Sequence, residues 1–142
     1  RTQHAIWRLR NGELDGYEAK GIVIMIGTNN DNTPEEIRDG VAALIELCRR
    51  KQPRAKILLL GIFPRGHLPT DKWGDKPRLT NPLLERLAGD AGVEYLDFGR
   101  RFQEPDGTIS REMMGDFLHP EAKGYVIWRE EILPFVRKSC GK

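Results

Sequence analysis

The chain has 142 residues, of which 39% are hydrophobic and 31% charged, as in one folded domain with a sizeable core rather than a disordered segment. Its net charge of +2 is too small to indicate a nucleic-acid partner, and no apolar run reaches the roughly 18 residues needed to span a membrane. Cys48 lies on a predicted helix face and Cys140 in a predicted C-terminal tail. We therefore expect neither a disulfide framework nor a metal site.

Helical and apolar stretches alternate along the chain. The residues with helical spacing predict four helices: Thr2–Leu9, Pro34–Lys51 behind an N-capping Thr33, Asn81–Ala91 and Glu121–Lys138. The residues expected to face inward on the last two helices are Leu83, Leu84, Leu87 and Ala91, and Tyr125, Trp128, Ile132 and Phe135 or Val136. Three apolar runs without in–out alternation predict parallel strands buried on both faces: Ile22–Ile26, Lys56–Ile62 and Val93–Phe98. This order predicts an α/β fold, a three-layer sandwich around a parallel sheet. The Pro- and Gly-rich segment Phe63–Thr80 is expected to be either a mobile lid or a structured rim.

The first candidate site motif is Gly27-Thr28-Asn29-Asn30, directly after the first predicted strand. In doubly wound sheets, ligands bind beyond the carboxyl ends of the strands. Asn29 would offer a neutral amide donor suited to a developing oxyanion. An ordinary turn would have the same composition, so the motif alone leaves both interpretations open.

The second motif is Asp116-Phe117-Leu118-His119-Pro120, just ahead of the last predicted helix. Asp116 can hydrogen-bond one imidazole nitrogen of His119 and leave the other free to accept a proton from a nucleophile. A capping aspartate beside a surface histidine would give the same pattern, and the two interpretations are compatible. Both motifs are expected at the same edge of the predicted sheet. Together the two motifs indicate acyl-transfer chemistry.

The chain offers no convincing nucleophile. Ser139 belongs to the predicted tail, and Ser110 is expected to cap a short helix. Neither lies in a Gly-x-Ser-x-Gly elbow. The hypothesis that Ser110 is a relocated nucleophile is therefore weaker than the two hypotheses given below.

The two motifs resemble blocks of the SGNH, or GDSL-type, esterase/lipase superfamily, most closely the branch with the platelet-activating-factor acetylhydrolase catalytic subunits. The resemblance covers essentially the whole chain. It implies a flavodoxin-like SGNH hydrolase fold in which His119 is the general base, Asp116 orients it, and Asn29 donates to the oxyanion hole. Asn30 and Phe63 are expected to contact substrate, and Phe63 belongs to the loop that also carries Trp73. Trp73 could contact substrate or anchor the rim. No cofactor is implied.

The family's Gly-Asp-Ser block and its second, glycine-bearing block do not occur in this sequence. Residues 1–142 are therefore expected to be the C-terminal portion of a single SGNH hydrolase domain, with the first two strands missing. The expected partners are a small ester substrate and a complementing N-terminal segment or chain that carries the nucleophilic serine; a homo-oligomer is also allowed. The chain alone is expected to be inactive, and its compartment is left open. The alternative is a non-catalytic α/β interaction module or an inactive hydrolase fragment.

Overall fold

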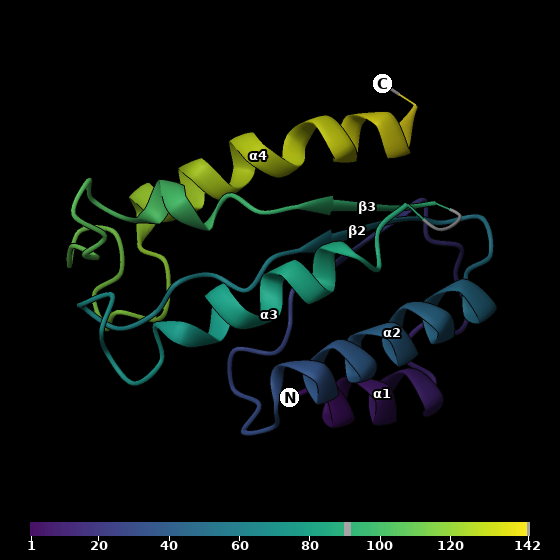
Figure 1. The fold of residues 1–142 in the computed structure, drawn as a ribbon. Coiled ribbons are helices and arrows are strands. Elements are labelled where there is room, and N and C mark those ends of the chain that lie inside the picture. Colours follow the sequence, from purple (N-terminus) through teal and green to yellow (C-terminus); the bar gives the residue numbers. More distant parts are fainter. Residues whose placement is uncertain (90–91, 142) are drawn as a thin grey trace.

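The structure, a computed structural model, describes residues 1–89 and 92–141. Its elements follow the predicted alternation (Figure 1). In chain order they are α1 (Thr2–Arg10), β1 (Gly21–Ile24), α2 (Pro34–Lys51), β2 (Lys56–Leu60), α3 (Asp75–Glu85), β3 (Val93–Leu96), the short 3₁₀ helix Gly99–Phe102 and α4 (Ala122–Cys140).

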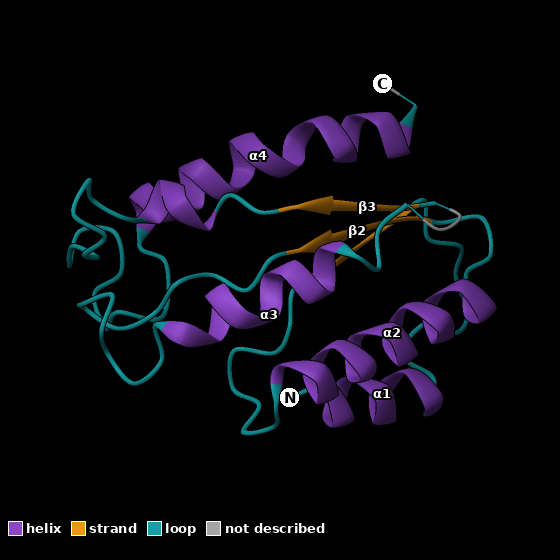
Figure 2. Ribbon diagram, viewed as in Figure 1, coloured by secondary structure: helices purple, strands orange, loops and turns teal. Residues whose placement is uncertain are grey.

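The three strands form one parallel sheet in the order β1-β2-β3 (Figure 2). Ile22 of β1 lies opposite Ile57 of β2, and Leu58 of β2 lies opposite Glu94 of β3. Since β2 is central, its side chains are covered on both faces and read as a continuous apolar run. Within the described residues, β1 has a neighbour on one side only.

The sheet separates two hydrophobic cores, because successive side chains of a strand point to opposite faces. Ile57 and Leu59 pack into the core shared with α1, α2 and Leu84 of α3. Leu58 and Leu60 pack into the second core, beneath α4. Figure 1 shows the resulting three layers, with α4 on one face of the sheet and the other three α-helices on the opposite face. The predicted three-layer α/β fold is therefore confirmed.

The start of α2 follows its sequence signal. The Thr33 side chain accepts a hydrogen bond from the Glu36 amide, and the Glu36 carboxylate accepts one from the Thr33 amide. This reciprocal capping box satisfies two amides that would otherwise lack partners. The hydrogen bond from the Thr33 amide, and after it the one from the Asn32 side chain, lower the pKa of the Glu36 carboxyl.

The third helix differs from its prediction. It runs from Asp75 to Glu85, not from Asn81 to Ala91. Pro77 lies in the first turn, where an amide is not needed, and the helix continues through Pro82. It ends ahead of Gly89, which has a positive φ of 95°. Ala91, expected to face inward, lies outside the described residues.

Smaller differences affect the ends of other elements. Each strand is shorter than predicted at its carboxyl end, and Asp97, which was predicted to lie within the third strand, therefore lies in the loop beyond it. Ser139 and Cys140 belong to the last turn of α4 and not to a tail. Tyr125, predicted to face inward, is exposed, whereas Phe135 is buried. Cys48 is buried on α2 as predicted.

Candidate active site

The Asp116 carboxylate organises the loop ahead of α4. Its Oδ1 accepts hydrogen bonds from the amides of Leu118 at 3.0 Å and His119 at 2.8 Å. Its Oδ2 lies 2.6 Å from Nδ1 of the His119 ring. The amide and then the ring of His119 hold the pKa of Asp116 at about 2, below its ordinary value of 3.8.

This contact fixes what His119 can do. An ionised carboxylate only accepts hydrogen bonds, so Nδ1 carries the proton and donates it to Asp116. The lone pair of Nε2 is then free to accept a proton from a nucleophile. The side chain of His119 is 74% exposed, which leaves room for a reacting group beside it.

The loop between these two residues is held in an unusual backbone conformation. Phe117 has φ of 58°, a region that costs a bulky residue about 1–3 kcal/mol. The Phe117 carbonyl accepts a hydrogen bond from Gly66 at 2.9 Å, and its ring packs against His67 and Arg111. The surrounding structure thus holds Asp116 and His119 in hydrogen-bonding geometry.

The Gly27-Thr28-Asn29-Asn30 turn follows β1 and has a strict requirement for glycine. Gly27 has φ of 122°, and a Cβ there would lie 2.8 Å from Cδ1 of Ile62. The turn closes with a 2.9 Å hydrogen bond from the Asn30 amide to the Gly27 carbonyl. It places the Asn29 side chain at the surface, where Oδ1 accepts a hydrogen bond from Arg65 at 3.1 Å.

Asn30 points elsewhere. Its side chain is only 1% exposed. It donates to the hydroxyl of Thr2 and to Asn32, and it accepts from the Thr2 amide at 3.1 Å. Because both of its polar atoms are engaged at the start of α1, the structure gives no support to the predicted contact between Asn30 and substrate.

Asn29 and His119 line one cavity of about 230 Å³. Its walls are mostly apolar and come from the loop after β1, the segment after β2, the loop ahead of α4 and the first turns of α4: Met25, Ile26, Thr28, Ile62, Phe63, Pro64, Leu118, Pro120, Tyr125 and Trp128. Phe63 is buried, and its ring packs edge-on against Trp128 at 5.0 Å. A base, an amide donor and an apolar wall therefore meet in one place.

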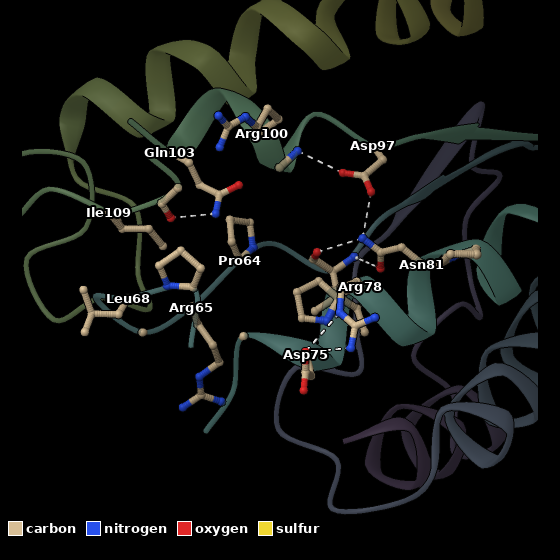
Figure 3. A pocket seen from close by; sticks show the side chains of 18 residues that line it. Pro64, Arg65, Leu68, Asp75, Arg78, Asn81, Asp97, Arg100, Gln103 and Ile109 are labelled. Atoms are coloured by element: carbon tan, nitrogen blue, oxygen red, sulfur yellow. Dashed lines mark hydrogen bonds and ion pairs between the residues drawn. The ribbon is translucent and has the colours of Figure 1, made fainter. Parts of the chain in front are cut away.

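A larger cavity of about 420 Å³ (Figure 3) shares Ile62 and Pro64 with the lining of the smaller one. Asp97, directly after β3, accepts hydrogen bonds here from Asn81 at 2.7 Å and from the Gly99 amide at 2.9 Å. Both carboxylate oxygens are thus held in place. The lining of this cavity includes no histidine, whereas His119 lines the smaller one, so we place the candidate active site in the smaller cavity.

The segment after β2 is a structured rim. The Gly66 amide bonds to Phe117, and the His67 carbonyl accepts from the Ile109 amide at 3.0 Å. Trp73 lies beneath Arg65, Lys72 and Lys76, whose cationic groups are 4.4, 4.7 and 5.0 Å from its ring. Sequence reasoning missed Arg65, whose only sequence signal is its position in Pro64-Arg65-Gly66, directly beyond a strand.

The two serines are not part of this site. Ser139 packs against Gly21 at the amino end of β1, the opposite end of that strand from Asn29. Ser110 precedes a turn, where its carbonyl accepts from the amides of Met113 and Met114, so the predicted helix cap is wrong. Among the described residues, no His, Cys, Asp and Glu side chains gather as a metal site would require. In the same part of the chain, no helix is long and apolar enough to cross a bilayer.

The fold and the site together define an α/β protein with an Asp–His pair at a cavity beyond its parallel sheet, and comparison with known proteins gives the family. Residues 1–127 match the GDSL-like Lipase/Acylhydrolase family, and the chain belongs to that family. It is 42% identical over 125 residues to the human platelet-activating factor acetylhydrolase IB subunit alpha2, covering 87% of this chain and 55% of that protein. For human subunit alpha1 the identity is 40% over 126 residues, with coverages of 87% and 54%. The chain thus spans about half the length of these relatives.

Solved structures share the fold. A putative platelet activating factor protein from Streptococcus pneumonia superposes with a TM-score of 0.77 at 22% identity, covering 92% of this chain and 67% of that one. A GDSL-like lipase from Bacteroides thetaiotaomicron gives a TM-score of 0.75 at 18% identity, with coverages of 97% and 71%.

Proposed function

We propose that residues 1–142 supply the base, its orienting carboxylate and one oxyanion donor of a serine ester hydrolase. The nucleophilic serine would lie outside these residues, on a preceding segment or a separate chain. The observation that carries the proposal is the 2.6 Å contact between Asp116 and His119 at the cavity that Asn29 also lines. Family membership supports the acylhydrolase chemistry.

In the proposed reaction the serine oxygen attacks the ester carbonyl while Nε2 of His119 takes its proton. The carbonyl oxygen becomes an oxyanion that accepts a hydrogen bond from Nδ2 of Asn29. His119 then returns the proton to the leaving alcohol, and an acyl-enzyme remains. Water repeats the cycle with His119 again as base, which releases the carboxylic acid and the free serine.

The substrate we propose is an ester of a short acyl group, such as an acetyl ester. The apolar cavity of about 230 Å³ is below the roughly 300–1,000 Å³ typical of sites for drug-sized ligands. Phe63 and Trp128 form part of its wall and would contact the acyl group. The names of the relatives, which are acetylhydrolase subunits, support the same class.

The edge of β1 is where we place the complementing segment. Val23 and Met25 are exposed there, and an apolar groove of about 230 Å³ follows this edge between β1, α1 and α2, lined in part by Ala5, Leu9 and Leu44. An open, hydrophobic strand edge is an aggregation liability that native proteins cover. The non-catalytic alternative would use the same edge to bind an unrelated partner.

The direct test is Asn29→Ala in a complete protein that includes the serine-bearing segment. Loss of one oxyanion donor lowers kcat by about 10²–10³-fold. The matched control is Asn32→Ala, in the same loop but outside the cavity lining. Unchanged ester turnover in the Asn29 variant would contradict the assignment, and equal loss in both variants would indicate general damage to the loop.

A further inference from the structure

Asn29 has one side-chain contact that decides how its amide points. Oδ1 accepts a hydrogen bond from Nη1 of Arg65 at 3.1 Å. Arginine is a donor only, so it must meet the oxygen of the amide and not its nitrogen. Nδ2 then points away from Arg65, and it has no partner among residues 1–89 and 92–141. An amide so oriented keeps both of its N–H groups available to a ligand.

Arg65 is itself held in place from several sides. Nη1 also donates to the Thr28 carbonyl at 3.2 Å, and the guanidinium lies 4.4 Å from the Trp73 ring centre. Figure 3 shows the Arg65 side chain directed away from Asn81 and Asp97, out of the larger cavity. Lys76 supports the same turn by donating to the carbonyls of Thr28 at 3.1 Å and of Asn30.

The backbone next to Arg65 contacts the other half of the site. Gly66 donates its amide to the carbonyl of Phe117, the strained residue between Asp116 and His119. Pro64 lines the cavity that holds Asn29 and His119. One short segment thus connects the oxyanion donor to the loop that carries the base.

We propose that Arg65 is a positioning residue for Asn29: its guanidinium holds Oδ1 and so presents Nδ2 to the oxyanion. This inference rests on the proposed function. The amide is oriented before substrate arrives, so no reorganisation is needed during the reaction. The positive charge on the oxygen side also polarises the amide and strengthens its N–H groups as donors to a negative oxygen.

The test is a double-mutant cycle in the complete protein. Arg65→Met should lower kcat by about 10–100-fold with KM changed less than about 2-fold, since misplacement of a catalytic group acts on the transition state. In the Asn29→Ala background the same change should have no further effect. Arg65→Lys, which keeps the charge but not the planar guanidinium, should be intermediate. A full Arg65 effect in the Asn29→Ala background, or wild-type kcat in Arg65→Met, would overturn the proposal.

A matched control and a second readout separate this proposal from the proposed function. Arg78→Met removes another arginine that, like Arg65, is among the residues lining the larger cavity. Arg78 pairs with Asp75 and does not contact Asn29. The side-chain ¹⁵N–¹H₂ signals of Asn29 should keep their chemical shifts and their heteronuclear NOE in Arg78→Met. In Arg65→Met the shifts should move towards those of a free asparagine amide and the heteronuclear NOE should fall, because the amide gains rotational freedom about χ2. Unchanged signals would contradict the positioning role. The same changes in shift and heteronuclear NOE in a protein without esterase activity would leave the positioning intact and refute the hydrolase assignment.

Discussion

Asp116 accepts three hydrogen bonds within four residues of chain, and this local arrangement fixes the imidazole of His119, the proposed base. The Asp-x-x-His spacing was enough to predict the pair, because a short loop forces these side chains together. Asn29 and Phe63 likewise reach the cavity that the sequence order indicated. Arg65 could not be predicted, since its contact joins residues 36 positions apart. Asn30 could not be distinguished from Asn29 without knowing where α1 packs.

The pKa of Asp116 gives a test at this scale. Because the folded-state pKa is about 2, below the ordinary 3.8, ionised Asp116 favours the folded state above about pH 4 and this contribution is lost as pH falls towards 2. The Cγ resonance of Asp116 should titrate near pH 2. In His119→Ala the midpoint should rise only part of the way, since the amide of residue 119 still donates. A wild-type midpoint near 3.8 would contradict the contact.

The charge of Asp116 has a separate role in turnover. Asp116→Asn keeps the shape of the side chain but no longer favours protonated Nδ1, so the imidazole can adopt the wrong tautomer. We expect kcat in the complete protein to fall by roughly 10²–10⁴-fold. Asp106→Asn is the control, an exposed aspartate that bonds only to its own turn at Thr108. Equal kcat values for the two variants would exclude Asp116 as the orienting group.

At the scale of elements, the capping box of α2 was predictable in part from Thr33 and Pro34, because caps are local. Thr33→Ala should lower the free energy of unfolding by about 1 kcal/mol, measured by urea denaturation. Thr70→Ala, in an exposed turn, is the control and should change it by less than about 0.5 kcal/mol. A Thr33 variant as stable as the control would mean that the cap contributes nothing to α2.

The helix α3 shows what a local reading misses. Pro77 and Pro82 argued against a helix in this part of the sequence. The helix nevertheless forms, because the buried side chains of Thr80, Asn81 and Leu84 stabilise it by tertiary packing. Tyr125 shows the converse, since its helical spacing predicted burial but it lies at the exposed rim of the cavity. Whether an apolar side chain is covered depends on neighbouring elements that spacing alone does not reveal.

At the scale of the whole molecule, alternating helices and strands were sufficient to predict the three-layer architecture, because parallel strands must be covered on both faces.

The open edge of β1 leads to a further prediction for the complete protein. Val23→Lys should lower its free energy of unfolding by roughly 2–4 kcal/mol, because the proposed segment would bury an unpaired charge.

Val126→Lys provides the comparison for this edge. Val126 on α4 is 48% exposed, close to the 39% of Val23, and is not among the residues that line the groove beside β1. If urea denaturation shows the same small change for both lysine variants, β1 has no covering segment and the proposed complementation is incorrect.

The claim that residues 1–142 provide the base for a serine located elsewhere is tested most directly by a fluorophosphonate probe. The complete protein is treated with the probe, digested and analysed by mass spectrometry to locate the adduct, and His119→Ala is treated in parallel. We predict a single adduct on a serine outside residues 1–142, formed far more slowly in His119→Ala. An adduct on Ser110 or Ser139, or labelling that does not depend on His119, would contradict the account.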